Sequence, residues 1–292
     1  MLTRSTLLHL RIHFSWFLLP TYLLALSCAR DIVISKAVLT FFILHFLLYP
    51  ASNAYNSYYD RDTDSIGTLK HPPPVENQLH TVSLMMDAMA VMAALFIGWI
   101  FATAVLIYGL CSKAYSNDNI RFKRKPVLGL LGVGLVQGSL TFLMSYYGAQ
   151  DIRLEDILNM RILSAAVISC LFITAAYPMT QIYQHKSDSE RGDISFSILL
   201  GVRGTFIFCA LFLAIAVTGF TIYFRHFFST YHAVVFSVYM LPLGIFFLVW
   251  MVESFHDFSK ADYDNTMRLN TLSSTALNLC FLFFIINNHI KS

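Results

Sequence analysis

The chain has 292 residues, of which 57% are hydrophobic and only 13% are charged, and its formal net charge is +3. A soluble protein of this length would carry about twice that charged fraction. The composition excludes an ordinary soluble enzyme and predicts an all-α membrane protein, with one transmembrane domain covering residues 1–292. We expect membrane lipids around it and no nucleic acid among its partners.

Nine stretches are apolar enough for membrane helices, each of which needs about 20 residues. They cover residues 7–28, 34–60, a block 80–112 that is too long for one span and is divided near Gly98 into two, 126–148, 160–184, 203–224, 231–253 and 270–289. No small-residue cleavage pattern follows the first span, so we expect it to be retained. The five cysteines are scattered singly, which argues against a zinc site or a disulfide framework.

The basic residues are distributed unevenly between the two sides that nine crossings create. Of the 20 Lys and Arg residues, the six on the side of the C-terminus are Arg30, Lys36, Arg153, Arg161, Arg225 and Lys291. The other fourteen lie on the side of the N-terminus, and the positive-inside rule places that side in the cytoplasm. We expect an integral protein of the bacterial inner membrane, with its N-terminus and motif loops cytoplasmic.

A polar motif ends the second predicted span, where Asn56-Ser-Tyr-Tyr-Asp60-Arg-Asp62-Thr-Asp64 follows the apolar run. Residues four apart on a helix differ by about 40° in direction, so Asn56, Asp60 and Asp64 form one stripe and Asp62 points the opposite way. Carboxylates crowded at a membrane boundary repel each other and lose hydration, and a divalent cation removes both penalties. The stripe predicts a Mg²⁺ site, because Mg²⁺ commonly takes one or two carboxylates plus substrate phosphate oxygens. The alternative is a solvated helix end.

The sixth predicted span repeats this arrangement. Pro178, Gln184 and Asp188 have the spacing of the proline, amide and carboxylate in the second span. A proline inside a span bends it and frees a carbonyl group, which is tolerated where a cavity is lined. Two bent spans that end in an amide–carboxylate pair on the same side predict two halves of one metal–diphosphate site. Chance similarity between two tyrosine- and proline-rich helix ends is the alternative.

Together these motifs resemble those of the UbiA superfamily of intramembrane prenyltransferases. The first is similar to the NxxxDxxxD motif, and the run from Gln184 through Asp188, Gly192 and Ser195 to Leu199-Leu200-Gly201 resembles the second motif. Tyr115-Ser116 with Arg121 to Pro126, and Lys70-His71-Pro72, resemble two basic, proline-containing loops. The resemblance covers the whole chain in the order of spans and loops.

The resemblance implies a helical barrel around a central cavity, in which Mg²⁺ binds an isoprenoid diphosphate and the prenyl group passes to an acceptor. The metal ligands expected from the two motifs are Asn56, Asp60, Asp64, Gln184 and Asp188, and all of these except Gln184 are expected catalytic residues. The acceptor is expected to be aromatic or otherwise lipophilic.

Gln184 departs from the second motif, which usually begins with an aspartate. An amide can still bind a metal or a bridging water through its carbonyl oxygen, but it supplies no charge. Glu190 and Asp193 are candidates to compensate, although on a straight helix Asp193 faces away from Asp188. Either Mg²⁺ is held more weakly on this side or the chemistry differs.

Gln184 is also a candidate to bind substrate, and further residues share that expectation. Lys70, Arg121 and Lys123 are expected to stabilise the charge that forms on a departing diphosphate, and Arg268 is a candidate for the diphosphate or the acceptor. A topology signal on an anionic membrane face is the alternative for the basic run, and a helix cap is the alternative in the last loop.

Tyrosines flank both motifs, and an aromatic, water-free cavity suits a carbocation. Each π-face stabilises a nearby cation by about 0.5–2 kcal/mol. Tyr115 and Tyr177 are candidates to bind substrate, and the candidates to line the cavity also include Tyr55, Tyr58, Tyr59 and Tyr183. Anchoring at the membrane interface is the alternative for each.

Three functions of different class fit these features. The favoured one is a Mg²⁺-dependent prenyltransferase. The second is a terpene cyclase of the same fold, in which the cation is captured by double bonds of the substrate and no acceptor is needed. The third is a transporter or channel, which is disfavoured because the acids lie at a membrane face beside basic loops rather than at the midplane.

Overall fold

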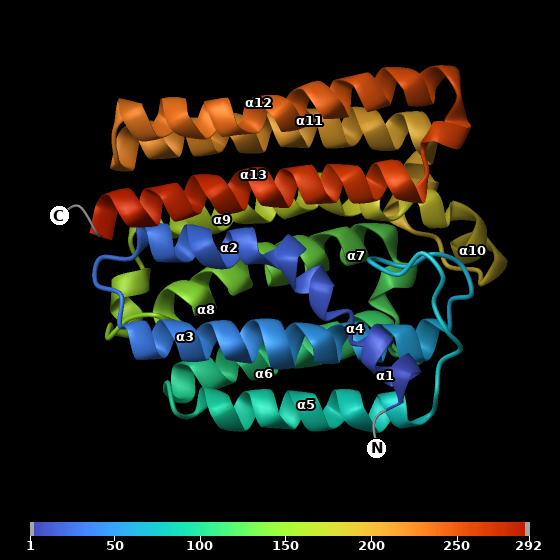
Figure 1. Cartoon of the computed structure of the whole chain (residues 1–292), viewed down its shortest axis with the longest axis horizontal. Helices are drawn as coiled ribbons and strands as arrows, with labels where there is room; N and C mark the ends of the chain where they lie inside the picture. Colours follow the sequence, from blue (N-terminus) through green and yellow to red (C-terminus); the bar gives the residue numbers. More distant parts are fainter. Residues whose placement is uncertain (1–2, 290–292) are drawn as a thin grey trace.

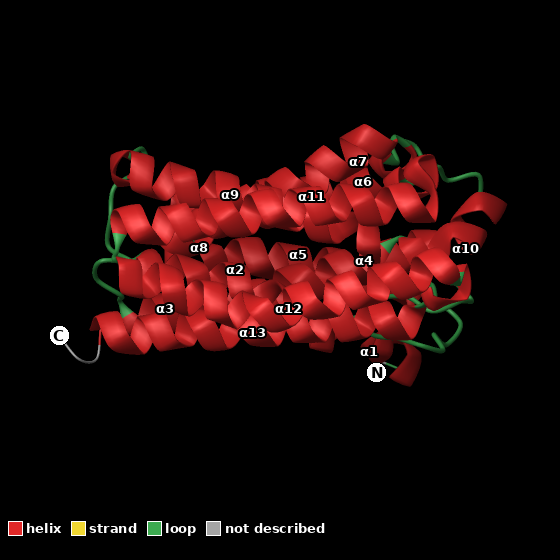
Figure 2. Ribbon diagram, turned by 90° about the horizontal axis from the view of Figure 1, so that it is seen from above, coloured by secondary structure: helices red, strands yellow, loops and turns green. Residues whose placement is uncertain are grey.

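The computed structural model describes residues 3–289, and this part of the chain folds into helices and loops with one isolated bridge between Ile66 and Leu69. The long helices run side by side (Figure 1), which confirms the all-α prediction. Seen from above, they form a bundle whose loops gather at its two ends (Figure 2).

The helices are α1 (Arg4–His9), η1 (Ile12–Phe14), α2 (Ser15–Cys28), α3 (Ile34–Phe42), η2 (Ile43–Leu48), α4 (Tyr49–Asp60), α5 (Gln78–Ala94), α6 (Trp99–Ser116), η3 (Phe122–Arg124), α7 (Pro126–Val133), η4 (Gly134–Leu140), α8 (Thr141–Gly148), η5 (Leu154–Ile157), α9 (Met160–Ala176), η6 (Tyr177–Thr180), η7 (Ile182–Gln184), α10 (His185–Glu190), α11 (Phe196–Phe227), α12 (Thr230–His256), η8 (Phe258–Lys260) and α13 (Tyr263–His289).

These elements form nine long helical segments within the described residues, in agreement with the nine predicted spans. Six of the segments are long and apolar enough to cross a membrane: 34–60, 126–148, 160–190, 196–227, 230–256 and 263–288. The division near Gly98 is confirmed, because α5 ends at Ala94 and α6 begins at Trp99. Gly98 has φ of 153°, which a glycine adopts without steric cost.

Large apolar side chains remain exposed on the outer surface, as expected for a protein surrounded by lipid tails. Phe96 is 86% exposed, and Ile207, Leu241 and Ile245 on the long helices α11 and α12 are each more than half exposed. An aqueous surface with so many exposed large apolar side chains would favour aggregation. The pattern agrees with an integral membrane protein.

Both motif-bearing spans lose regular α-helical geometry at their prolines. The π-helical segment η2 comes directly before Tyr49-Pro50, and α9 gives way to the 3₁₀ segments η6 and η7 at Tyr177-Pro178. Proline has no N–H to donate to the preceding turn, so the backbone changes its hydrogen-bonding pattern there. As a result the motifs begin on separate helical segments, α4 after η2 and η7 leading into α10, which lie near the same end of the bundle (Figure 1).

Candidate active site

A cavity of about 350 Å³ lies inside the bundle. It is lined by residues of η1, α2, α4, α6, the α7–η4 segment, the span from α9 to α10, and α13. One part of the lining carries the charged groups, which are Arg11, Asp60, Asp62, Lys123, Asp188, Arg191 and Asp193. The rest is largely apolar and aromatic, with Phe14, Phe17, Leu18, Leu128, Val133, Val136 and Ile173 among its members.

The two motif ends meet at the charged part of this cavity. Asp60 at the end of α4 and Asp188 in α10 both line it, and Arg191 connects them. The Arg191 Nη2 atom donates to Asp188 Oδ1 at 2.7 Å, and its Nη1 atom donates to the backbone carbonyl of Asp60 at 3.1 Å. The two amide–carboxylate pairs are thus halves of one site in space.

Helix α4 ends earlier than the stripe prediction requires. Arg61 adopts a left-handed conformation with φ of 47° directly after Asp60, so the helical repeat stops there. Asp62 therefore turns into the cavity and pairs with Arg191, whereas Asp64 is exposed and does not line the cavity. The predicted directions of Asp62 and Asp64 were wrong, because the stripe argument assumed a continuous helix. A metal-binding role for Asp64 stays a prediction.

Asn56 orients its neighbours through both ends of its amide. The Nδ2 atom donates to Asp60 Oδ2 at 2.8 Å and to Ser116 Oγ at 3.2 Å, and the Oδ1 atom accepts from Arg11 Nη2 at 3.3 Å. Ser116 belongs to the Tyr115-Ser116 pair that the sequence indicated. Asn56 therefore holds the Asp60 carboxylate in the cavity, and its role as a metal ligand stays a prediction.

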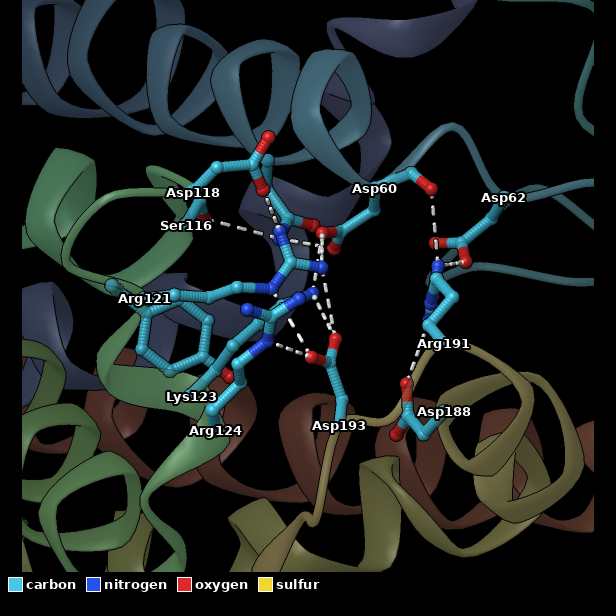
Figure 3. Close-up of polar contacts among 12 residues, drawn as sticks. Asp60, Asp62, Ser116, Asp118, Arg121, Lys123, Arg124, Asp188, Arg191 and Asp193 are labelled. Carbon is cyan, nitrogen blue, oxygen red and sulfur yellow. Dashed lines mark hydrogen bonds and ion pairs between the residues drawn. The ribbon is translucent and has the colours of Figure 1, made fainter.

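The basic loop after α6 brings three cations to the acids (Figure 3). Lys123 Nζ pairs with Asp60, and Arg121 Nη2 lies 3.4 Å from Asp60 Oδ1. Arg121 also makes a two-pronged contact with Asp193, which accepts a third bond, of 2.7 Å, from Arg124 Nε. Lys123 lines the cavity directly, and Arg121 is buried behind it and positions the loop.

Asp193 also lies at this site, contrary to the direction expected on a straight helix. Helix α10 ends at Glu190, and Gly192 adopts a left-handed φ of 71° that reverses the chain. Burial by itself raises the pKa of Asp193, but hydrogen bonds from Arg121 and Arg124 outweigh it and hold the pKa at about 2. Asp193 is thus a fixed negative charge that organises the basic loop.

The pKa of the Asp62 carboxyl is shifted in the opposite direction, above its ordinary value. Burial raises its pKa, and the nearby Asp60 charge raises it further, while Arg191 offsets part of the effect. A carboxylate that is destabilised by a neighbouring carboxylate gains from an added cation. Asp62 is therefore a strong candidate for contact with a metal ion.

Tyr115 and Tyr177 line the cavity as a pair, with their hydroxyl oxygens 2.5 Å apart. Gln181 Nε2 donates to the Tyr177 hydroxyl at 2.8 Å and fixes its ring on the 3₁₀ segment. Gln184 and Tyr183 also line the cavity. The sequence prediction named Tyr115, Tyr177, Tyr183 and Gln184 as candidates, and all four line this one cavity.

The comparison with known protein families decides the identity of this arrangement. The model of the UbiA prenyltransferase family matches residues 17–275, which is most of the chain. The chain belongs to the UbiA prenyltransferase family. The expectation drawn from the sequence motifs is thereby confirmed.

One curated protein is a distant relative of this UbiA-family chain. A digeranylgeranylglyceryl phosphate synthase of Methanosarcina mazei is 26% identical over 167 residues, which are 56% of this chain and 54% of that relative. The match therefore spans about half the length of the curated relative.

Two solved structures share the fold over almost the whole chain. A UbiA homolog from Archaeoglobus fulgidus, bound to DMAPP and Mg²⁺, has a TM-score of 0.70 at 18% identity, covering 96% of this chain and 99% of that one. An apo UbiA homolog from Aeropyrum pernix K1 has a TM-score of 0.70 at 18% identity, covering 95% and 98%.

Several predicted residues of this UbiA-family chain lie away from the cavity. Lys70 is exposed and pairs with Asp264 at 2.7 Å, and Arg268 is exposed on α13, on which Met267 and Asn270 line the cavity instead. Tyr55, Tyr58 and Tyr59 do not line the cavity but gather around His80 of α5. Periodicity and position in the sequence do not show which face of a helix meets a cavity, so the expectation that these three tyrosines line it was wrong. Substrate binding by Lys70 and Arg268 stays a prediction.

Arg11 is a cavity-lining residue whose importance the sequence only hinted at, through a charge inside the first predicted span. It is 8% exposed, and its Nη2 atom donates to the Asn53 carbonyl at 3.1 Å and to Asn56. Its Nε atom is buried without a hydrogen-bond partner, and within residues 3–289 no carboxylate forms an ion pair with it. A buried guanidinium of this kind is a ready site for an anionic group.

The cavity supplies hard oxygen donors for Mg²⁺ but not a complete cage. In the described residues no three Asp, Glu, His or Cys side chains are close enough to hold an ion by themselves. Asp60, Asp62 and Asp188 each supply carboxylate oxygens to the same cavity. Because Mg²⁺ commonly takes one or two carboxylates and completes its shell with phosphate oxygens, this donor set fits an ion shared with a diphosphate.

Proposed function

We propose that this UbiA-family protein transfers a prenyl group from an isoprenoid diphosphate to a lipophilic acceptor within the membrane, with Mg²⁺ as cofactor. The observation that carries the proposal is the division of one cavity into a charged end, built from both motifs, and an apolar, aromatic remainder. An isoprenoid diphosphate has the same division, with a charged head and an apolar chain. A homolog of the same fold bound to DMAPP and Mg²⁺ supports this assignment.

The chain's own cations would hold the diphosphate and stabilise its departure. The bond between the prenyl carbon and the diphosphate breaks, and its electron pair leaves with the diphosphate. Lys123 lines the cavity and would accept part of that charge, while Arg121 keeps Lys123 in place. One such group contributes about 3–4 kcal/mol in comparable sites. When bound, Mg²⁺ would neutralise further charge on the same head group.

The apolar part of the cavity would protect the carbocation that remains. Tyr115 and Tyr177 offer π-faces close to the charged end, and the apolar lining excludes water that would quench the cation. A lone pair of the acceptor then forms the new bond to the prenyl carbon, and the acceptor's proton passes to an oxygen of the released diphosphate.

The acceptor we favour carries an anionic group, as a glyceryl phosphate lipid does. The relative from Methanosarcina mazei is named for such a product, and Arg11 offers a buried cation with which no carboxylate of the described chain forms a direct ion pair. An aromatic acceptor is the alternative. In that case Arg11 would serve the donor diphosphate.

We propose that the charged end of the bundle faces the cytoplasm, and that the protein resides in the bacterial inner membrane. Fourteen of the 20 Lys and Arg residues support this orientation. In a background without the five native cysteines, an impermeant thiol reagent applied to intact spheroplasts should label Glu155→Cys but not Asn119→Cys. Labelling of Asn119→Cys alone would reverse the proposed orientation.

Product analysis tests the reaction itself. Purified protein is incubated with geranyl, farnesyl or geranylgeranyl diphosphate and Mg²⁺, with and without glyceryl phosphate lipids or aromatic acceptors, and the products are identified by mass. Acceptor-dependent diphosphate release is expected. A hydrocarbon or terpene alcohol formed without an acceptor would indicate the cyclase, and flux across liposomes without diphosphate release would indicate a transporter.

A further inference from the structure

We propose that Arg191 is a resident counter-cation that holds the carboxylates of both motif ends before substrate arrives and then binds the diphosphate. Metal binding thereby becomes dependent on the diphosphate. This inference rests on the proposed prenyl diphosphate function, and it concerns a residue outside both sets of motif ligands.

The position of Arg191 follows from the way α10 ends. Arg191 comes directly after Glu190, the last residue of α10, and Gly192 follows in a left-handed conformation with φ of 71°. A β-carbon at Gly192 would meet no atom within 4 Å, so the backbone conformation and not crowding explains the glycine. The reversal leaves the Arg191 side chain between the ends of α10 and α4 (Figure 3).

The Arg191 guanidinium contacts three acidic residues from the two motif ends. Its Nη1 atom pairs with the Asp62 carboxylate and donates to the backbone carbonyl of Asp60, and its Nη2 atom pairs with Asp188 at 2.7 Å. Its side chain is 24% exposed and lines the cavity. A fixed cation therefore pairs with carboxylate oxygen atoms that a metal ion would bind.

One donor of Arg191 remains unused. The Nε atom is buried and has no hydrogen-bond partner, which is costly for a charged group. The planar guanidinium can donate to two phosphate oxygens at once. A diphosphate that enters the cavity therefore offers an acceptor for the N–H group that the carboxylates leave unpaired. This unpartnered donor is the observation that points to an anionic ligand.

The neutral amide at Gln184 lowers the negative charge that Arg191 has to balance. With Gln184 in place of an acid, the second motif contributes the carboxylates of Asp188 and Asp193 to the cavity lining, and Arg191 pairs with Asp188 as well as with Asp62. Removal of the Arg191 charge would take the ion-pair partner from both the Asp62 and the Asp188 carboxylates. They would then attract a divalent ion more strongly, while the diphosphate would lose a partner.

The inference therefore predicts two changes of opposite direction, measured without turnover. Wild type, Arg191→Gln and Arg191→Lys are reconstituted in nanodiscs, and binding of Mn²⁺ alone is followed by its electron paramagnetic resonance signal. Binding of inorganic diphosphate is measured by calorimetry, first in EDTA and then with Mn²⁺. Arg191→Gln should bind Mn²⁺ alone about tenfold more tightly and diphosphate in EDTA about tenfold more weakly.

Arg61→Gln is the matched control, because it removes the same charge one residue from Asp60. Arg61 is exposed, faces Asn77 and Tyr58, and does not line the cavity. It should change either affinity by less than about twofold. Arg191→Lys, which keeps the charge but not the planar geometry, should fall between wild type and Arg191→Gln.

The outcomes separate this inference from the proposed function. If wild type binds diphosphate and Arg191→Gln binds both ligands as wild type does, the counter-cation role is refuted and the proposed function stands. If both affinities fall together in Arg191→Gln and Arg191→Lys, Arg191 is a structural residue and the inference is refuted. If wild type fails to bind diphosphate with or without Mn²⁺, the proposed function and the inference both fail.

Discussion

Arg121 and Asp193, which lie 72 residues apart in the sequence, face each other with two parallel contacts, Nε to Oδ1 at 3.1 Å and Nη2 to Oδ2 at 2.9 Å. Both side chains are at most 4% exposed. The pair ties the basic loop after α6 to the segment between α10 and α11. Because Lys123 follows Arg121 by two residues and pairs with Asp60, the Arg121–Asp193 pair fixes the position of a cation at the cavity.

Asp193→Asn should destabilise the protein, because it removes the carboxylate that accepts two hydrogen bonds from the buried Arg121 guanidinium. We expect the free energy of unfolding to fall by about 3 kcal/mol, as is usual when one partner of a buried pair is removed. Chemical unfolding in detergent measures the change. Asp151→Asn is the control, since its ion pair with Lys36 at 2.5 Å lies on an exposed surface and should contribute less than about 1 kcal/mol.

The pH dependence of this difference follows from the Asp193 pKa. Arg121 and Arg124 outweigh burial and hold that pKa at about 2, below the ordinary value of 3.8. The folded state therefore binds fewer protons than the unfolded state between these values, so stability falls as the pH falls through them. The gap between wild type and Asp193→Asn should be complete above pH 4 and shrink toward pH 2. A difference in the free energy of unfolding that stays constant over this range would contradict a stabilising role for the Arg121–Asp193 pair.

Asp60→Ala and Asp188→Ala should each abolish Mg²⁺-dependent diphosphate release, because both carboxylates line the charged end of the cavity. We expect a loss of at least about 100-fold, the order seen when a group that stabilises transition-state charge is removed. Release is measured with a coupled diphosphate assay on folded, monodisperse protein. Full turnover in either variant would argue strongly against the site.

Asp62→Asn and Asp64→Asn form a matched pair that compares the structure with the motif. Asp62 faces the cavity and Asp64 is exposed, so we expect Asp62→Asn to weaken Mg²⁺-dependent diphosphate binding more than Asp64→Asn does. Titration with inorganic diphosphate at several Mg²⁺ concentrations shows which of the two variants binds diphosphate more weakly. The reverse order would show that the segment after Asp60 rearranges when the ligand binds, and would support the motif.

Tyr177 should act through its ring rather than its hydroxyl group if it faces a carbocation. Tyr177→Phe keeps the π-face and should retain the rate within about threefold, whereas Tyr177→Leu should lose about 3- to 30-fold, corresponding to about 0.5–2 kcal/mol. Single-turnover rates with geranylgeranyl diphosphate measure both. An equal loss in the two variants would instead assign the effect to the hydrogen bonds with Tyr115 and Gln181.

Arg11 should recognise an anionic group on the acceptor. Arg11→Gln is expected to raise KM for a glyceryl phosphate acceptor by about tenfold or more, since one charged hydrogen bond is lost, while KM for the donor changes little. Arg11→Lys should recover part of the loss. A rise in the donor KM alone would assign Arg11 to the diphosphate and favour an uncharged or aromatic acceptor.

Much of the architecture was readable from local chemistry. Apolar length predicted the nine helical segments, and Gly98 marked the turn between α5 and α6. The matching proline, amide and carboxylate spacing predicted that the ends carrying Asp60 and Asp188 would meet, as they do. These features depend on composition and on neighbours within a few residues, which the sequence displays directly.

The identity of the acids and cations that face the cavity was decided by tertiary structure. Helical periodicity gives a side chain's direction only while the helix continues, and the left-handed residues Arg61 and Gly192 end α4 and α10 within the motifs. Asp62 and Asp193 therefore turn inward and Asp64 turns outward. The sequence by itself determined which spans carry the charge, but ion pairing across distant segments determined which charges share the cavity, because the cost of burying each one is offset only by partners that the fold brings to it.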